Sequence, residues 1–196
     1  DPLHLTNCDM PEYHSNGDDR DFVREPMGLA AAARIAGELG FLLPTTKMVD
    51  AIYKRAQVKL KPRPMKPTSQ MVSTDYFMRH DQILDAQRAK TRLSLDALAA
   101  GQKKDIVLTN RLRSKPGRVA IYGWHQPNGR PIQPLSTVHG ADYADYSHGV
   151  RLVSQTAFLN GQPTDLADIM ADTELASAVS SEGPIPDARG LLASGD

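Results

Sequence analysis

The spacing of apolar positions along this chain changes near residue 105. Before that point apolar side chains recur every three or four residues, which predicts helices over about 26–39, 46–56 and 80–100. After it, short runs rich in Val, Ile and Tyr predict strands over 106–112, 119–124, 132–135 and 148–154. Helices followed by strands are typical of an α+β domain. We therefore predict an antiparallel sheet over about 105–160, with helices from the N-terminal half packed on one side of it.

Capping residues and turn dipeptides support these elements. Pro26 suits the first position of a helix, and Thr45 or Thr46 is a good N-cap for the second helix. Two Asn-Gly dipeptides, at 128–129 and 160–161, tolerate the positive φ that tight hairpin turns need. The strand region is thus predicted to fold back on itself at least twice.

Length and composition predict one globular domain with polar ends. A chain of 196 residues with 40% hydrophobic residues is long enough to bury a core. Residues 1–25 are polar and turn-rich and predict an irregular acidic arm. Residues 182–196 are rich in Gly and Pro and predict a flexible tail. The single α+β domain is therefore expected over 26–181.

The formal net charge of zero conceals an uneven distribution. Residues 1–25 carry seven acidic and two basic residues, and residues 156–196 carry seven acidic residues and one basic residue. The basic residues thus gather in the middle, which favours an anionic polymer as partner, or else acidic ends that fold back over a basic body.

The Pro-rich basic stretch 59–67 is either a docking strip or a solvated loop. No nucleic-acid motif is present, so a nucleic-acid partner is not expected, and the sequence sets no oligomeric state.

Few sequence features indicate the cellular compartment of this protein. No apolar run approaches the roughly 20 residues of a membrane helix, so no transmembrane segment is expected. The chain begins with Asp1 rather than Met, which favours a processed, secreted or periplasmic protein, with the cytoplasm as the alternative. Cys8 stands alone, so it forms neither an internal disulfide nor a CxxC metal site.

Chemically useful side chains concentrate in residues 119–153. His125, His139 and His148 lie here with Asp145, at the predicted strand ends and in the loops beside them. Such positions commonly carry catalytic groups on a rigid scaffold. We expect His139, Asp145 and His148 to activate a water molecule, with His125 assisting.

The same groups leave several mechanisms open. His139, Asp145 and His148 could supply two nitrogens and one oxygen to Zn²⁺, with Asp142 as a rival ligand. The second option is acid–base chemistry without a metal, carried out by the same histidine and aspartate side chains. Ser147 is a third option, as a nucleophile, although adjacent strand side chains point to opposite faces, so a histidine other than His148 would have to be its base. In a purely structural role, Asp145 would pair with Arg151 and His148 would bond a backbone carbonyl.

Two short segments of this region resemble a known motif: Val138-His139-Gly140 and Ser147-His148-Gly149-Val150-Arg151-Leu152 are similar to the HG…SHGCxRL block of L,D-transpeptidases of the YkuD type. In that family the block lies on a β-rich catalytic fold, and its cysteine attacks a peptidoglycan stem peptide. The resemblance spans residues 138–152 and departs from the pattern at Val150, which follows Gly149 where the family has cysteine. Valine supplies no thiolate. The resemblance thus favours cell-wall peptides as substrates without the family's nucleophile.

Three classes of function follow from these observations. The leading hypothesis is a hydrolase acting on a polar polymer, a peptide or a glycan. In the second, a non-catalytic module binds a sugar or an anion by stacking and charge, through Trp124, Tyr143, Tyr146 and the basic surface. The expected substrate contacts of the hydrolase are the same three aromatic residues and Arg151. The third is a structural or assembly protein that contacts sister chains.

Overall fold

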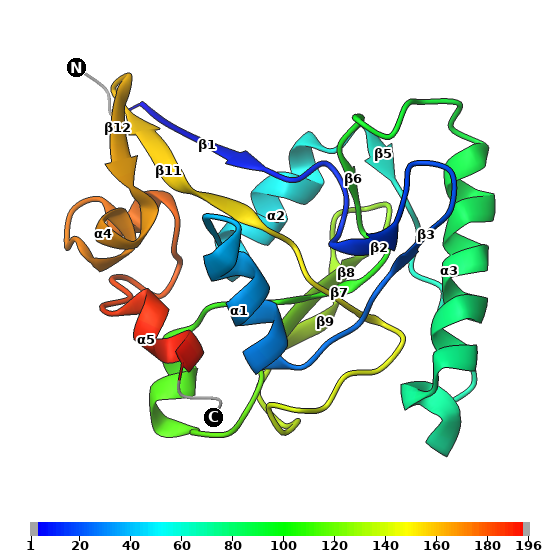
Figure 1. The fold of residues 1–196 in the computed structure, drawn as a ribbon. Coiled ribbons are helices and arrows are strands. Elements are labelled where there is room, and N and C mark those ends of the chain that lie inside the picture. Colours follow the sequence, from blue (N-terminus) through cyan, green and yellow to red (C-terminus); the bar gives the residue numbers. More distant parts are fainter. Residues whose placement is uncertain (1–3, 194–196) are drawn as a thin grey trace.

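The computed structural model describes residues 4–193 and has an α+β fold, as predicted (Figure 1). The α-helices are α1 (Leu29–Glu38), α2 (Thr46–Arg55), α3 (Thr74–Ala89), α4 (Leu166–Ala171) and α5 (Ala188–Ala193). Short 3₁₀ turns span Ser69–Val72, Asn110–Ser114 and Ala176–Ala178. None of the described helices is both long and apolar enough to cross a bilayer.

The strands form two four-stranded sheets and two small ones within the described residues. The first sheet has the order β1 (Leu5–Asp9), β11 (Val153–Leu159), β12 (Gln162–Asp165), and β4 (Phe41–Leu42) also pairs with β11. The second has the order β10 (His148–Gly149), β7 (Lys104–Ile106), β8 (Ile121–His125), β9 (Pro131–Ser136). The small sheets pair β2 (Ser15–Gly17) with β3 (Phe22–Arg24) and β5 (Val58–Lys59) with β6 (Ala99–Ala100). Two pairs are parallel, β10 with β7 and β5 with β6.

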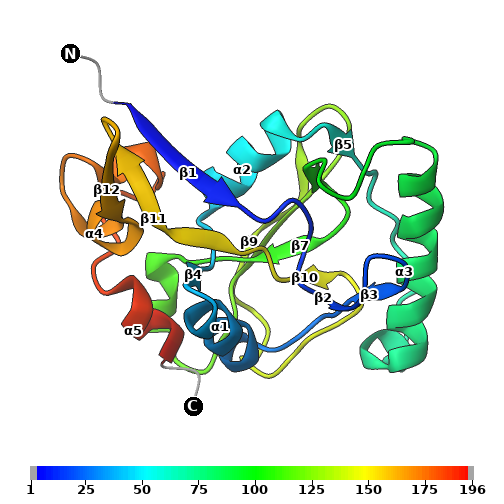
Figure 2. The ribbon, with the colours of Figure 1, turned by 45° about the horizontal axis from the view of Figure 1, so that its top comes forward.

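The predicted single sheet over 105–160 is therefore two sheets. Between β10 and β11 the chain leaves the second sheet and enters the first, where β11 lies between β1 and β12, strands from the two ends of the chain (Figure 2). Asn7 of β1 is the register partner of Ala157, and Thr164 of β12 pairs with the same residue from the other side. The pairing of β1 with β11 joins residues that are far apart in the sequence, so no local pattern predicts it.

Local signals predicted α2 and the hairpins correctly. The Thr45 side chain accepts a hydrogen bond from the Met48 backbone N–H and so caps α2. Gly129 has φ 85° in the turn between β8 and β9. Asn160 and Gly161, with φ 51° and 82°, connect β11 and β12.

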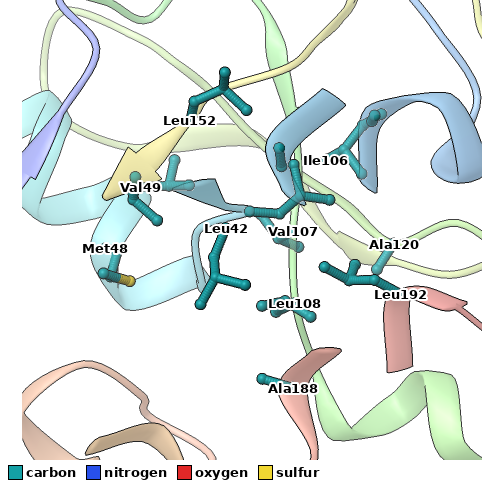
Figure 3. Packing of buried hydrophobic residues seen from close by; sticks show 14 of the residues in the cluster. Leu42, Met48, Val49, Ile106, Val107, Leu108, Ala120, Leu152, Ala188 and Leu192 are labelled. Carbon is teal, nitrogen blue, oxygen red and sulfur yellow. The ribbon is translucent and has the colours of Figure 1, made fainter. Parts of the chain in front are cut away.

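Both predicted irregular ends are structured. Residues 1–25 contain β1, β2 and β3, because alternate residues of β1 face inward against the rest of the protein. The expected tail from 182 contains α5, and Ile185, Leu191 and Leu192 are buried. Figure 3 shows Leu192 beside Leu108 and Ala120 of the main core. The six residues of α5 are too few for their apolar spacing to predict a helix from the sequence. Residues 194–196 of that tail lie outside the described part.

The longest predicted helix and two strands differ in extent. α3 ends at Ala89 rather than near residue 100, because the chain turns at Arg92 with φ 57° and the Arg88 guanidinium holds the next segment through the carbonyls of Ser94, Leu95 and Ala97. The strand expected over 106–112 ends at Ile106, and Thr109 caps a 3₁₀ turn instead. The strand expected over 148–154 is split between β10 and β11.

The main core is formed by α1, α2, α4 and α5 against the strands of both large sheets. A separate apolar cluster of Tyr76, Trp124 and Tyr146 joins α3 to the second sheet. α3 lies at the opposite end of the molecule from α4 and α5 (Figures 1 and 2). The loop that carries most of the predicted site connects β9 to β10, next to this second cluster.

Candidate functional site

Backbone pairing holds the loop that carries His139. The His139 carbonyl accepts a hydrogen bond from Val119 N at 3.2 Å, and Gly140 forms a bridge with Arg118. Ala141 N donates to the Gly117 carbonyl at 2.9 Å. The loop is thus attached to the segment that leads into β8, which gives the His139 ring a defined position.

The turn before β10 is built around the Asp145 carboxylate. Asp145 Oδ1 accepts hydrogen bonds from the Ser147 backbone N–H at 2.8 Å and from Ser147 Oγ at 2.5 Å. An aspartate that bonds the backbone two residues further on forms an Asx turn. The hydroxyl of Ser147 is fully buried and already donates to Asp145, so the geometry favours a positioning role for Ser147 over nucleophilic attack.

Four side chains of this region lie close together, and we call them, with Lys104, the 139–148 cluster. The His139 ring stacks on Tyr143 with centroids 4.3 Å apart and planes at 12°. The His148 ring lies 6.0 Å from His139 and 5.7 Å from Tyr143. Asp145 Oδ2 accepts a hydrogen bond from the Tyr143 hydroxyl at 3.2 Å and lies 4.0 Å from His148 Nε2.

The cluster is buried at one side and accessible at the other. His148 and Asp145 are buried, whereas His139 and Tyr143 are only partly covered. Neither ring nitrogen of His148 makes a hydrogen bond with any described residue. A buried polar group without such a bond is unusual and calls for an explanation. His139 is therefore the imidazole that a substrate can reach, and His148 supports it from within.

Burial controls protonation in this cluster. Burial lowers the pKa of His148 to about 4, although the Asp145 carboxylate opposes the change. Burial also lowers the pKa of His139, and the positive charges of Lys104 and Arg118 add to that effect. Burial alone would raise the pKa of Asp145, but His148 and the hydrogen bonds from Ser147 outweigh it, so that pKa is lowered. At neutral pH the cluster therefore combines two neutral imidazoles with one carboxylate.

Lys104 belongs to this site although no sequence pattern indicated it. Lys104 is the register partner of His148 in the parallel pair of β7 and β10, and its Nζ lies 5.1 Å from the centre of the Trp124 ring. Burial lowers its pKa, while Asp145 raises it. The neighbouring Lys103 is fully buried and donates to the Tyr146 carbonyl at 2.6 Å, and burial lowers its pKa to about 7. A Lys-Lys pair at the start of a strand is otherwise an ordinary sequence feature.

Three of the four predicted substrate-binding residues are buried. Trp124 and Tyr146 pack beneath α3, where Trp124 Nε1 donates to the Gln102 carbonyl at 3.0 Å and Tyr146 accepts from Met65 N at 2.8 Å. Arg151 is fully buried and donates to the carbonyls of Met10 and Ala99. Of the four, only Tyr143 is partly exposed to a ligand in this conformation.

His125 lies apart from the other two histidines of the region. Its Nε2 is 2.8 Å from Asp50 Oδ1, and its ring stacks on Tyr53 of α2 with centroids 4.6 Å apart. The expected convergence of three imidazoles is therefore limited to His139 and His148. The physical reason is sheet order: β10, which carries His148, pairs with β7, and β7 separates it from β8, which ends at His125.

The expected zinc ligands are not assembled. Among residues 4–193, no group of three or more His, Cys, Asp or Glu side chains lies close enough together to hold a metal ion. One Asp145 oxygen bonds Ser147 and the other bonds Tyr143, and the rival ligand Asp142 is exposed. In this conformation a metal centre does not fit the side chains of His139, Asp145 and His148. The proposed chemistry therefore uses no metal ion.

An open groove of about 450 Å³ lies next to the exposed side of the cluster. It is lined by Ser114, Lys115, Pro116, Arg118, Thr137 and Val138. Arg118 Nη1 donates to the Val138 carbonyl at 2.7 Å, one residue before His139. No described carboxylate lies within 4 Å of the side-chain nitrogens of Arg111, Arg113, Lys115 or Arg118. Lys115 and Arg118 therefore line the groove without a carboxylate partner, and their charges attract an anionic ligand.

Comparisons with protein-family models, with curated proteins and with solved structures give no match to this chain. The function is therefore inferred from the geometry of the site.

Proposed function

We propose that this chain is a hydrolase that acts on a polar polymer, a peptide or a glycan, with His139 as the general base. The observation that carries the proposal is the arrangement of the His139 ring, which is partly exposed, stacked on Tyr143 and close to the Asp145 carboxylate. A general base must be neutral at the working pH and reachable by the proton it accepts. Of the two histidines in the cluster, His139 meets both conditions.

In this mechanism the neutral His139 imidazole takes a proton from a water molecule as that water attacks a carbonyl or glycosidic carbon. The imidazolium then returns the proton to the leaving nitrogen or oxygen as the C–N or C–O bond breaks. The imidazolium that forms is stabilised by the negative charge of Asp145, which favours the protonated form of His139. Lys104 lies beside the cluster and supplies positive charge where an oxyanion develops. His148 is a positioning residue: its ring packs edge-on against Tyr143 and supports the stack under His139.

The shape and charge beside His139 favour a polymer over a small metabolite. The groove is open rather than enclosed, and Lys115 and Arg118 line it. An extended chain can lie along such a surface while one of its bonds reaches His139. The cations favour a polymer that carries carboxylate or phosphate groups.

The test is hydrolysis in ¹⁸O-labelled water. The purified chain is incubated with peptidoglycan, acidic polysaccharides and denatured proteins, and soluble fragments are analysed by mass spectrometry. Wild-type protein is expected to release fragments that carry one ¹⁸O atom. His139→Ala is expected to slow release by about 10²-fold or more, and Asp145→Asn to slow it less. His4→Ala is the matched control, because the His4 side chain is exposed and remote in sequence. Equal rates for His139→Ala and wild type would remove His139 from the chemistry.

A second candidate function, a module that binds an anionic polymer without cleaving it, is favoured by one observation. Arg111, Arg113, Lys115 and Arg118 fall within eight residues and have no carboxylate partner among the described residues. Titration of heparin into wild type and into an Arg113→Gln, Arg118→Gln double variant separates the two candidates. Salt-sensitive binding that survives His139→Ala, together with no labelled fragments from any polymer, would favour the binding module.

A further inference from the structure

A second concave site lies on the other side of the main core, between β1 and α2. This cavity, which we call the β1–α2 cavity, has a volume of about 320 Å³. Its walls include the buried apolar side chains of Met48, Ile52, Val153 and Val179. Small-molecule sites typically begin at about 300 Å³ and are lined mainly by apolar groups with a few polar ones. It shares no lining residue with the 139–148 cluster or its groove.

The strand that covers this cavity presents polar residues to an apolar helix face. Leu5, Asn7 and Asp9 alternate with exposed residues along β1, so all three point inward. An amide and a carboxylate facing Met48 and Ile52 carry a desolvation cost unless they find partners. Asn7 Nδ2 and Asp9 Oδ2 are buried and make no hydrogen bond with a described residue. Buried polar atoms without such partners are rare in folded proteins.

The cavity also has a cation opposite this strand. Arg55, at the end of α2, lines the cavity and is exposed. Its charge acts on Asp9: burial raises the pKa of Asp9, while Arg151 and Arg55 favour the charged carboxylate. The Arg55 guanidinium makes no hydrogen bond or ion pair within 4 Å to a described residue. Opposite charges thus face the same cavity with space left between them.

We propose that the β1–α2 cavity binds a free apolar α-amino acid, with its ammonium group on Asp9, its carboxylate on Arg55 and its side chain against Met48 and Ile52. A zwitterion carries both charges on one carbon centre and so bridges a separated carboxylate and guanidinium. The apolar wall accepts a side chain of the size of leucine or phenylalanine. The site is independent of the proposed hydrolase and requires no activity.

Calorimetric titration with three related probes tests the proposal. L-Leucine is expected to bind the full chain. N-acetyl-L-leucine lacks the ammonium group and L-leucinamide lacks the carboxylate, so each is expected to bind about tenfold or more weakly. These three measurements use wild-type protein alone and therefore stand even if a variant fails to fold. Absence of L-leucine and L-phenylalanine binding at millimolar concentration would overturn the proposal, as would equal binding of the three leucine probes.

Two variants assign each charge to its partner. Asp9→Asn is expected to weaken L-leucine by about tenfold or more but to leave N-acetyl-L-leucine unchanged, because that probe has no ammonium group to lose. Arg55→Gln is expected to weaken L-leucine similarly and to leave L-leucinamide unchanged. Lys54→Gln is the matched control, because Lys54 precedes Arg55 in α2, is exposed and does not line the cavity. L-Leucine binding that is unchanged in both Asp9→Asn and Arg55→Gln would contradict the assignment.

Discussion

His148 and Lys104 are register partners in the parallel pair of β10 and β7. The pairing places an ammonium group beside two imidazoles, and its charge disfavours protonation of both His148 and His139. Burial is the main cause of the lowered pKa of the partly exposed His139, and the Lys104 charge adds to it. This pairing predicts how the pKa of His139 should respond when the Lys104 charge is removed.

Lys104→Gln is expected to raise the pKa of His139. Removal of a positive charge makes the imidazolium less unfavourable, so the ring accepts a proton at a higher pH. Arg118→Gln should act in the same direction, because Arg118 also lowers the pKa of His139. The measurement is a histidine-selective NMR titration, with Lys90→Gln on the exposed end of α3 as the control. If His139 is the general base, the acidic limb of the activity profile should move to higher pH with it. A pKa of His139 that is unchanged or lower in Lys104→Gln would contradict the arrangement.

His80 is expected to make the fold unstable in mild acid. Its ring is fully buried against Tyr146, and burial lowers its pKa to about 3 from an ordinary value of 6.5. Between pH 6.5 and about 3 the unfolded chain binds a proton that the folded chain excludes. Stability is therefore complete above pH 6.5 and is lost as the pH falls. Asp105 has the opposite sign, because burial raises its pKa to about 6, and it offsets part of this loss.

A His80→Phe variant isolates the contribution of His80. Phenylalanine keeps a ring against Tyr146 but does not titrate. Between pH 7.5 and pH 4 the free energy of unfolding of wild type should fall relative to the variant by about 3 kcal/mol. Urea denaturation at the two pH values measures the difference. Parallel pH dependence in both proteins would show that His80 protonates in the folded state.

Arg24 is expected to be essential to the packing of α3. Its fully buried guanidinium lies 2.9 Å from Asp81 and from Asp85, both on α3, and 3.1 Å from Glu12. Arg24→Met would leave the buried Asp81 without its cation and Glu12 with only Arg88, at 3.7 Å. Breaking a buried pair in this way costs about 3–5 kcal/mol of unfolding free energy. The matched control is Arg34→Met, which removes an exposed partner of Glu38 and should change little. Chemical denaturation compares the two, and equal stability of both variants would show that the buried network is dispensable.

The elements that were predicted correctly depend on local chemistry. Thr45 caps α2 wherever the helix packs, and Asn160-Gly161 turns because of its own backbone preferences. The same holds for the turn at Asp145, where the carboxylate and Ser147 are neighbours in sequence. The proximity of His139 and His148 was predictable for this reason, since one short loop connects them.

The parts that were missed depend on distant partners. Nothing near Lys104 indicates that it pairs with His148, and nothing near β1 indicates that Asn7 pairs with Ala157. The grouping of His125 with His148 required β8 and β10 to be neighbours, and β7 lies between them. Trp124 and Arg151 have side chains suited to ligand binding, but each finds its partners inside the protein. A sequence pattern carries residue type and local spacing, whereas strand order and burial are set by the whole fold.

The two His-Gly pairs of the site provide a last prediction, because their glycines have different surroundings. A Cβ at Gly149 would lie 2.6 Å from Cδ1 of Tyr13 and 2.8 Å from Cβ of Lys103, whereas a Cβ at Gly140 would meet nothing within 4 Å. Neither glycine has a positive φ, so backbone strain does not distinguish them. Gly149→Ala should therefore force Tyr13 or Lys103 to move and destabilise the fold by about 1–3 kcal/mol.

Gly140→Ala is the matched control and should leave stability unchanged or slightly higher, since alanine restricts the unfolded chain. Thermal and urea denaturation of both variants test the pair. Because Tyr13 donates to Asp105 and Arg151 stacks on its ring, the movement forced at Gly149 would also disturb that buried network. If Gly140→Ala destabilised the chain more than Gly149→Ala, close packing at β10 would not be the reason for glycine after His148, and a role of Gly140 in the loop would have to replace it.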